Sequence, residues 1–258
     1  MGTDKKTVIA YNEYAKRWAK RKESGLNIAH DFLEKPAMYS KLPDLKNKTV
    51  LCVGCGSGEE SSYLKSLGAK KVIGIDISSG LIEIAKKNHP EVEFHVMDME
   101  NINFPEETFD FVYSSLVMHY VEDWTKTLNS VKEVLKKNGT FIFSTHHPAV
   151  WSAERKRDEN KRSSLLGYVK FPNENKCEVH GDYLNTRKID DIWYDEFKVT
   201  YYHKSFSSIM KDIIQSGFKI TDVLEPKALD EAKEKHKVFW EIRQKIPIFI
   251  IFELKKLE

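Results

Sequence analysis

The stretch Val50-Leu-Cys-Val-Gly-Cys-Gly-Ser-Gly-Glu-Glu60, or VLCVGCGSGEE, decides the fold of this chain. A buried strand is predicted over residues 48–53, glycines follow at every second position, and a helix is predicted over residues 59–67. Glycine lets the backbone turn sharply and lets a ligand approach it, and the first turn of a helix offers free N–H groups. The pattern therefore indicates a ligand-binding loop between a strand and a helix.

Strands and helices alternate along the chain on both sides of this loop. Further strands are predicted over residues 71–76, 92–97, 109–114, 140–144, 218–224 and 247–254, and further helices over 8–24, 27–40, 79–88, 124–137 and 206–215. Alternation at this spacing predicts an α/β fold with a doubly wound, mostly parallel, seven-stranded sheet that is Rossmann-like and carries N-terminal helices.

The same pattern divides the chain into four predicted segments. Residues 1–47 form an N-terminal helical cap, and residues 48–150 form the cofactor-binding α/β core. The alternation then breaks, so residues 151–204 are expected to be an insertion after the fifth strand, and their charged run Glu154–Arg162 is expected to be a solvated loop. Residues 205–258 return to the core. Because ligands of open α/β sheets bind beyond the carboxyl ends of the strands, the insertion is placed to act as a lid over the site.

Composition excludes several classes of protein. The chain has 41 basic and 39 acidic residues spread along its length, which is no electrostatic footprint for nucleic acid. No apolar run approaches the roughly 20 residues needed to span a bilayer, and the N-terminus lacks the apolar region of a signal peptide. These features predict a soluble, cytoplasmic protein without a nucleic-acid or membrane partner, and they leave its oligomeric state open.

The spacing of the glycines bears on which cofactor the loop binds. A dinucleotide-binding loop has the pattern G-x-G-x-x-G, and Gly54 and Gly56 match it, but Glu59 stands at the sixth position and the third glycine is Gly58. Glu59 and Glu60 at the helix start would also repel a pyrophosphate. The loop therefore favours a ligand without phosphates, best of all one with a positive charge, over the NAD of an oxidoreductase.

The loop also contains a C-x-x-C pattern, formed by Cys52 and Cys55. Cys52 falls within the strand and is expected to be a small buried hydrophobe, and no second C-x-x-C exists to complete a zinc site. The histidines near predicted strand ends show no recognised ligand spacing either. No metal site is therefore predicted.

The motifs resemble those of class I S-adenosylmethionine-dependent methyltransferases, in the branch that acts mostly on small molecules. VLCVGCGSG resembles the first motif of the family, GIDIS (74–78) the second and HVMDME (95–100) the third. FPEETFDFVYSSLVMHYVEDW and VLKKNGTFIFS resemble the regions of the fourth and fifth strands. The motifs follow one another in the order of the family between residues 50 and 145.

The resemblance implies a site for S-adenosylmethionine, which the reaction converts to S-adenosylhomocysteine. The glycine loop would hold the methionine part, Asp76 both ribose hydroxyls, and Asp98 the adenine amino group. The aromatic N-terminal helix resembles one that folds over the cofactor in such enzymes. The expected cofactor contacts are Tyr11, Tyr14, Trp18, Gly54, Cys55, Gly56, Gly58, Asp76, Ile77, Met97, Asp98, Met99 and Ser114.

The implied reaction is transfer of a methyl group to a small-molecule acceptor by in-line displacement. His119 follows the predicted fourth strand and His146 the fifth, on the side where the acceptor would lie. Either is a candidate general base for a hydroxyl or protonated amine, or a residue that shapes the pocket. A non-catalytic cofactor-binding protein, or a partner subunit with the same fold, is the alternative. The aromatic residues of the insertion would suit an apolar or aromatic acceptor, or would form the insertion's own core.

Overall fold

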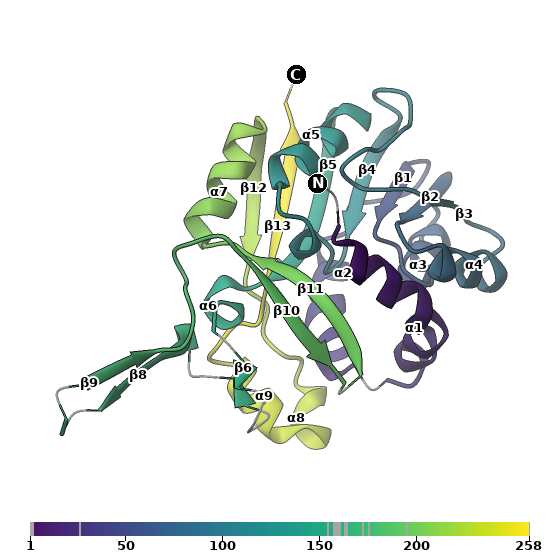
Figure 1. Cartoon of the computed structure of the whole chain (residues 1–258). Coiled ribbons are helices and arrows are strands. Elements are labelled where there is room, and N and C mark those ends of the chain that lie inside the picture. Colours follow the sequence, from purple (N-terminus) through teal and green to yellow (C-terminus); the bar gives the residue numbers. More distant parts are fainter. Residues whose placement is uncertain are drawn as a thin grey trace.

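A computed structural model describes residues 3–25, 27–153, 155–156, 161–162, 165–171, 173–174, 176–194 and 196–257. At its centre lies a seven-stranded sheet with the strand order β12-β13-β5-β4-β1-β2-β3 (Figure 1). The bounds of these strands are β1 Thr49–Val53, β2 Lys71–Asp76, β3 Glu93–Val96, β4 Phe109–Ser114, β5 Leu135–His146, β12 Phe218–Leu224 and β13 Phe249–Lys256.

Most neighbouring strands of the sheet are parallel. β1 pairs in parallel with β2 and with β4, β2 with β3, and β4 with β5. β13 runs antiparallel to β5, and β12 runs antiparallel to β13. The chain moves outward from β1 to β3 and then returns to place β4 on the other side of β1, so the strand order reverses between β1 and β4. The predicted doubly wound, mostly parallel sheet is thus confirmed, and its reversal point is where such sheets bind ligands.

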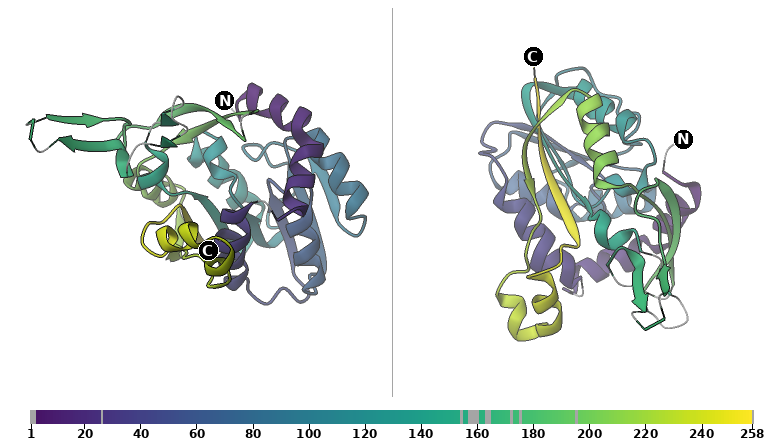
Figure 2. Two further views of the ribbon diagram at one scale, coloured as in Figure 1. Left: turned by 90° about the horizontal axis from the view of Figure 1, so that it is seen from below. Right: turned by 90° about the vertical axis from the view of Figure 1, so that its left-hand side faces the viewer.

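Helices cover both faces of the sheet (Figures 1 and 2). Val50 and Cys52 of β1 pack in a core with one group of helices, whereas Leu51 and Val53 pack in a second core with another. The first group is α2 Lys35–Ser40, α3 Glu59–Ser66 and α4 Ser79–Asn88; the second is α5 Trp124–Val134 and α7 Phe206–Gln215. Because successive side chains of a strand point to opposite faces, a continuously apolar strand such as β1 needs both layers.

The N-terminal region is helical, as predicted, with one irregularity. α1 spans Lys5–Glu23 and contacts α4, and α2 follows further along. Between them the predicted helix 27–40 contains a single π-helical turn, η1 His30–Glu34. Such turns are rare and occur often at functional sites.

The boundary between α5 and β5 differs from the prediction. The helix was expected to reach Lys137, but it ends at Val134, and β5 begins at Leu135 rather than Thr140. Leu135 is fully buried and pairs with Phe109 of β4, so its apolar side chain belongs to the strand and not to the helix face. Asn138 then takes a left-handed conformation (φ 59°), with which the chain turns within β5.

The segment between β5 and α7 contains two β-hairpins, of which one projects from the body of the molecule and the other packs against it. The first, from β8 Tyr168–Phe171 and β9 Lys176–Val179, projects away from the body (Figures 1 and 2). The second, from β10 Arg187–Trp193 and β11 Phe197–His203, lies beside α1. The remaining elements of this segment are α6 Pro148–Trp151, β6 Arg155–Lys156, β7 Lys161–Arg162 and η4 Leu165–Gly167.

The charged run Glu154–Arg162 falls largely outside the described residues, which omit Glu154 and residues 157–160. Its described parts, β6 and β7, pair as short antiparallel strands where a loop was predicted.

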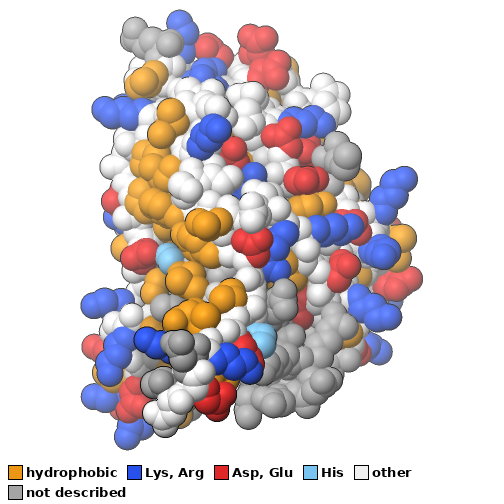
Figure 3. Space-filling view, turned by 60° about the vertical axis from the view of Figure 1, so that its left-hand side comes forward, with side chains coloured by type: hydrophobic (Ala, Val, Ile, Leu, Met, Phe, Trp, Pro, Cys, Tyr) orange, Lys and Arg blue, Asp and Glu red, His pale blue; other side chains and the backbone are white. Residues whose placement is uncertain are grey.

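Two short helices, α8 Glu231–Lys235 and α9 Lys237–Arg243, connect β12 to β13. On the side of the molecule that carries α7 and β12, hydrophobic side chains gather in a band, and basic and acidic side chains are interspersed around it (Figure 3). Exposed apolar residues of these elements include Phe206, Ile214 and Val223. Among the described helices, none is long and apolar enough to cross a membrane.

Candidate functional site

A cavity of about 590 Å³ lies beyond the carboxyl ends of β1, β2 and β4. α1 forms another part of its wall, as do residues of β5, α6 and the tip of the β10–β11 hairpin. Sites for small molecules commonly enclose roughly 300–1,000 Å³. The cavity therefore has the size and the place in the sheet that a small ligand requires.

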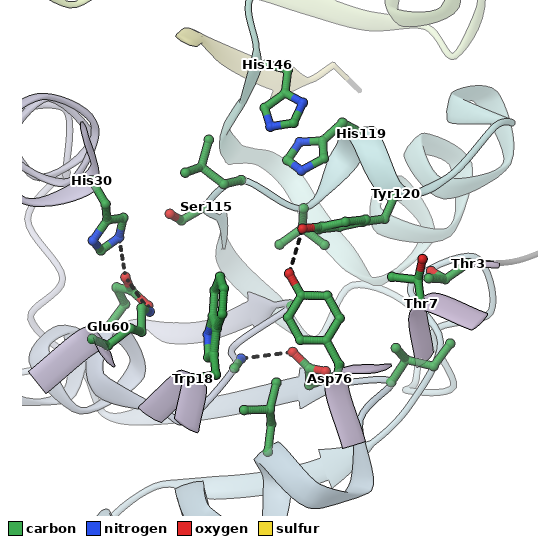
Figure 4. A pocket seen from close by; sticks show the side chains of 18 of the residues that line it. Thr3, Thr7, Trp18, His30, Glu60, Asp76, Ser115, His119, Tyr120 and His146 are labelled. Carbon is green, nitrogen blue, oxygen red and sulfur yellow. Dashed lines mark hydrogen bonds and ion pairs between the residues drawn. The ribbon is translucent and has the colours of Figure 1, made fainter. Parts of the chain in front are cut away.

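Most of the predicted site residues meet at this cavity. Those that line it are Tyr11, Trp18, Gly54, Gly56, Asp76, Ile77, Met97, Met99, His119 and His146. They come from six separate parts of the chain, and Figure 4 shows several of them around the open space. The fold thus brings the motifs together.

Five other predicted residues lie outside the described lining of the cavity: Tyr14, Cys55, Gly58, Asp98 and Ser114. The hydroxyl of Tyr14 donates to Glu196, 2.9 Å away, and its ring stacks on Phe197. Burial raises the pKa of the Cys55 thiol well above its usual value. Asp98 accepts a hydrogen bond from the backbone N–H of Glu100 at 3.0 Å, as a loop-capping residue does.

The glycine loop has the backbone that its sequence predicts. Gly54 and Gly56 both have left-handed conformations, with φ values of 66° and 56°. A Cβ at Gly54 would stand 2.3 Å from a methyl carbon of Val117, so only glycine fits. At Gly56 no heavy atom lies within 4 Å of the Cβ position, and the residue lines the cavity. The loop therefore leaves its backbone open to a ligand at Gly56.

Asp76 ends β2 and faces the cavity beside this loop. One carboxylate oxygen accepts the backbone N–H of Gly56 at 2.9 Å, and the other accepts that of Ser78 at 2.8 Å. Burial raises the pKa of Asp76, and the two backbone N–H groups oppose that rise. Since a carboxylate oxygen can accept two hydrogen bonds, each oxygen keeps capacity for a ligand.

α1 and the β10–β11 hairpin meet over the cavity through aromatic side chains. The buried ring of Phe197 contacts the rings of Tyr11, Tyr14 and Trp18, with centroid distances of 4.8, 4.7 and 5.8 Å. The hydroxyls of Tyr11 and Tyr120 are hydrogen-bonded at 2.6 Å. These contacts join segments that are far apart in the sequence into one cover.

A buried charged cluster, formed by Lys22, His30 and Glu60, was not predicted as part of the site. The ammonium of Lys22 lies 3.1 Å from one carboxylate oxygen of Glu60, and Nε2 of His30 lies 2.9 Å from the other (Figure 4 shows the latter contact). Burial disfavours the charged forms, but these contacts outweigh it and hold the pKa of Glu60 far below its usual range. The charge of Glu60 is therefore countered within the protein, which weakens the argument that it would repel a pyrophosphate.

The protonation of His30 follows from the same cluster. Burial lowers its pKa, but hydrogen bonds to Asp31 and Glu60 outweigh this and raise the pKa to about 9. His30 is therefore a cation at neutral pH, with carboxylates as its neighbours.

A second buried carboxylate, Glu34 in the π-helical turn, anchors the loop after β4. One of its oxygens accepts hydrogen bonds from the hydroxyls of Ser115, at 2.9 Å, and of Ser144. The Ser144 hydroxyl oxygen in turn accepts the backbone N–H of Leu116 at 2.9 Å. Leu116 has a left-handed conformation (φ 55°) that is costly for a non-glycine residue, and it lines the cavity.

The two candidate catalytic histidines are stacked on each other. The rings of His119 and His146 lie 3.6 Å apart and nearly parallel, and the other face of His146 stacks on Trp151 at 3.5 Å. His119 lies in the short helix η2 Met118–Tyr120, and burial lowers its pKa to about 3. Two imidazoles this close cannot both be protonated at little cost. His119 is therefore neutral at physiological pH.

Several lining residues were not predicted from the sequence. Lys22 follows Trp18 at the i,i+4 spacing and so shares its helix face, which could have pointed to it. His30 lies outside any motif, and Ser115 lies in the stretch that resembles the fourth-strand region of the family but was not singled out there. No group of three or more His, Cys, Asp or Glu side chains in the described part of the chain is arranged to hold a metal ion.

Comparison with known proteins gives matches over most of the chain. A family model described as a methyltransferase domain matches residues 51–143. The crystal structure of an S-adenosylmethionine-dependent methyltransferase from Mesorhizobium loti is 26% identical, with a TM-score of 0.71, and the match covers 86% of this chain and 97% of that one. A structure from Listeria monocytogenes assigned to the same enzyme class is 29% identical, with a TM-score of 0.71, and covers 87% and 97%.

A relative whose name states its acceptor matches over a shorter stretch. The phthiotriol/phenolphthiotriol dimycocerosates methyltransferase of Mycobacterium tuberculosis is 34% identical over 118 residues, which are 43% of this chain and 44% of that enzyme.

Proposed function

The chain is a class I S-adenosylmethionine-dependent methyltransferase, and we propose that it methylates a small-molecule acceptor bound in the cavity beside the glycine loop. The observation that carries this proposal is the continuity of the cavity, which joins Gly56 and Asp76 at one end to His119 and His146 at the other (Figure 4). Cofactor and acceptor could then meet within one cavity.

The residues at the end of the cavity beside the glycine loop fit S-adenosylmethionine. Gly56 leaves open the space that a Cβ would fill, and Asp76 keeps hydrogen-bonding capacity for a pair of ribose hydroxyls. Ile77 and Met97 supply an apolar wall for the adenine ring. Further contacts are assigned to the other lining residues of this end, namely Tyr11, Trp18, Lys22, Gly54, Glu60 and Met99. Direct contacts by Tyr14, Cys55, Gly58, Asp98 and Ser114 stay predictions.

When bound, S-adenosylmethionine supplies a methyl group on a positively charged sulfur, so that the acceptor atom bonds to the methyl carbon while the carbon–sulfur bond breaks and its electron pair stays on sulfur. Because the methyl group is already activated, the main task of the protein is to align acceptor and cofactor and to exclude water. The cover formed by α1 and the β10–β11 hairpin serves the second task. His119 and His146 lie where they can receive the proton that a hydroxyl or amine acceptor loses.

A small molecule is favoured as the acceptor for two reasons. The cavity has the volume of a small-molecule site and lies under the cover of α1 and the hairpin. The Mycobacterium tuberculosis relative is named for methylation of phthiotriol and phenolphthiotriol dimycocerosates, and not of a nucleic acid. A cofactor-binding protein without catalysis is the rival function.

The test is calorimetric titration of the protein with S-adenosylhomocysteine and, separately, with NAD. Asp76→Asn should weaken binding of S-adenosylhomocysteine by about tenfold to a hundredfold, because a neutral amide replaces a charged acceptor of the ribose hydroxyls. Asp222→Asn is the matched control, since Asp222 lies in the edge strand β12, where it pairs with Lys41. It should bind as the unchanged protein does.

The outcomes separate the competing functions. Binding of S-adenosylhomocysteine that depends on Asp76 supports the assigned cofactor site, and methylation of any small molecule in a following screen excludes the non-catalytic rival. Binding of NAD in preference to S-adenosylhomocysteine would refute the assignment of the cavity.

A further inference from the structure

If the cofactor occupies the end of the cavity at the glycine loop, the acceptor must occupy the opposite end, and its class can be inferred from that end on the basis of the proposed function. The charged groups of the cavity are unevenly placed. Among the described lining residues, the charged side chains are Lys22, His30, Glu60 and Asp76. Lys22 and His30 are both paired with Glu60, and Asp76 ends β2 at the cofactor end. Figure 4 shows Glu60 and Asp76 well apart from His119 and His146.

The acceptor end is walled by apolar and aromatic groups. Trp151 and Trp193 line it, together with Leu116, Ile248 and Phe249. Both indole N–H groups are already bonded within the protein: Trp151 donates to the carbonyl of Ile248 at 3.0 Å, and Trp193 donates to Asp191 at 3.2 Å. The indoles therefore offer this end of the cavity apolar ring surface and no hydrogen-bond donor.

One polar atom at this end lacks a partner. His119 is 2% exposed and lines the cavity, and its Nε2 has no hydrogen-bond partner among the described residues. Its other ring nitrogen, Nδ1, lies 3.5 Å from the hydroxyl of Thr145. An unsatisfied buried nitrogen is costly, so each one calls for an explanation. A bound molecule that hydrogen-bonds Nε2 provides one, provided that the surrounding side chains shift to open this buried nitrogen to the cavity.

We propose that the methyl acceptor is an uncharged molecule with a flat apolar ring and a hydroxyl group, and that the ring packs against Trp151 and Trp193 while the hydroxyl binds Nε2 of His119. A hydroxyl suits this nitrogen in either tautomer of the imidazole, because it can both donate and accept. The charged groups among the described lining residues lie at the cofactor end or are already paired with one another, as His30 and Lys22 are with Glu60. A carboxylate or ammonium group at the acceptor end would therefore be buried without a partner of its own, which is unfavourable.

The proton transfer that the reaction requires is consistent with this class of acceptor. As the hydroxyl oxygen bonds to the methyl carbon it becomes a strong acid, and its proton can pass to Nε2 of His119. A weak base suffices for this step, which fits a histidine whose pKa burial lowers to about 3. The proton then leaves for solvent, because the stacked His146 ring disfavours a lasting charge on His119.

Three phenols whose short para substituents differ in charge test the proposal: 4-ethylphenol is neutral, tyramine is a cation and 4-hydroxyphenylacetate is an anion. Their affinities are measured by ligand-observed NMR titration of the protein saturated with S-adenosylhomocysteine. 4-Ethylphenol should bind at least about tenfold more tightly than either charged phenol. Tyramine is the more stringent comparison. Aromatic walls can also attract cations, so weak binding of tyramine cannot be taken for granted.

A second measurement tests the role of His119. The protein should bind 4-ethylphenol more tightly than ethylbenzene, which lacks the hydroxyl, and His119→Asn should reduce this preference severalfold. His180→Asn, in the segment of the projecting β8–β9 hairpin, is the matched control and should keep the preference. The comparison of the three phenols uses the unchanged protein, so it stands even if His119→Asn does not fold.

The results distinguish this inference from the proposed function. If S-adenosylhomocysteine binds but a charged phenol binds as tightly as 4-ethylphenol, or 4-ethylphenol shows no saturable binding, the acceptor class is wrong and the methyltransferase function stands. If His119→Asn weakens 4-ethylphenol and ethylbenzene equally, the hydroxyl contact is wrong. If S-adenosylhomocysteine itself does not bind, both proposals fall.

Discussion

The titration of His30 should make the free energy of unfolding depend on pH. Its pKa is about 9 in the folded state because Asp31 and Glu60 accept hydrogen bonds from its ring, whereas an ordinary histidine has a pKa of 6.5. A raised pKa in the folded state stabilises the fold fully below pH 6.5, and this stabilisation is lost as the pH rises through about 9. Between these limits the free energy of unfolding should fall by about 1–3 kcal/mol on account of His30.

Chemical denaturation at a series of pH values between these limits measures this loss. His30→Gln removes the titrating group, so the variant should be less stable at pH 6.5 and should show a flatter dependence on pH. His180→Gln serves as the control, and its curve should parallel that of the unchanged protein. Equal slopes for His30→Gln and the unchanged protein would mean that His30 is neutral in the folded state.

For single residues, the sequence predicted site positions that belong to motifs, but not those that are joined only by side-chain contacts in the folded protein. Gly56 and Asp76, which line the cavity, could be predicted because a glycine loop and an acid at the end of the second strand have fixed places in the chain. Lys22, His30 and Glu60 come from three different elements, and their contacts arise only when α1, η1 and α3 pack together. No spacing in the sequence encodes a contact of this kind.

The π-helical turn η1 positions a carboxylate that supports the acceptor end of the cavity. Glu34 is fully buried, and its hydrogen bonds to Ser115 and Ser144 hold the loop in which Leu116 keeps its costly conformation. Glu34→Ala would leave both hydroxyls without their acceptor and create a cavity. The variant should therefore lose about 2–4 kcal/mol of unfolding free energy.

Urea denaturation measures this loss, and Glu83→Ala is the control. Glu83 is an exposed residue of α4, and its replacement should change the unfolding free energy by no more than about 0.5 kcal/mol. If Glu34→Ala is as stable as Glu83→Ala, the network does not hold the loop.

Element boundaries were predicted well where a periodic pattern ended at a clear stop signal. Helix α4 and strands β2 and β4 have the predicted bounds. The boundary between α5 and β5 was wrong because Leu135 continues the helical spacing of apolar residues, although it is buried as part of the strand. The π-helical turn was not foreseen, since its side-chain pattern resembles that of an ordinary helix.

At the scale of the whole molecule, the doubly wound sheet could be predicted because its strands and helices alternate in the sequence. The positions of the two hairpins could not, because pairing with α1 depends on contacts such as those between Thr7 and Thr200. The hydroxyl of Thr7 accepts the backbone N–H of Thr200 at 2.8 Å and donates to its carbonyl at 3.2 Å. Among the described residues, β11 of the second hairpin has these partners in α1.

The pairing of α1 with the β10–β11 hairpin predicts how the molecule responds to a ligand. Tyr11 and Trp18 of α1 line the cavity from one side, and Trp193 lines it from the hairpin. Because Phe197 and Thr200 tie the hairpin to α1, a ligand enclosed between them should stabilise both segments together. Saturation with S-adenosylhomocysteine should therefore slow amide hydrogen exchange in α1 and in β10–β11 by a similar factor, about tenfold or more.

Hydrogen exchange followed by mass spectrometry resolves these segments, and the projecting β8–β9 hairpin is an internal control whose exchange should not change. Phe197→Ala removes the ring that contacts Tyr11, Tyr14 and Trp18, so it should speed exchange in both segments without ligand and weaken binding of S-adenosylhomocysteine. Protection of α1 alone would show that the hairpin does not take part in enclosing the cofactor. In that case access to the cavity is controlled by the N-terminal helix, and the hairpin contributes only to the wall of the acceptor end.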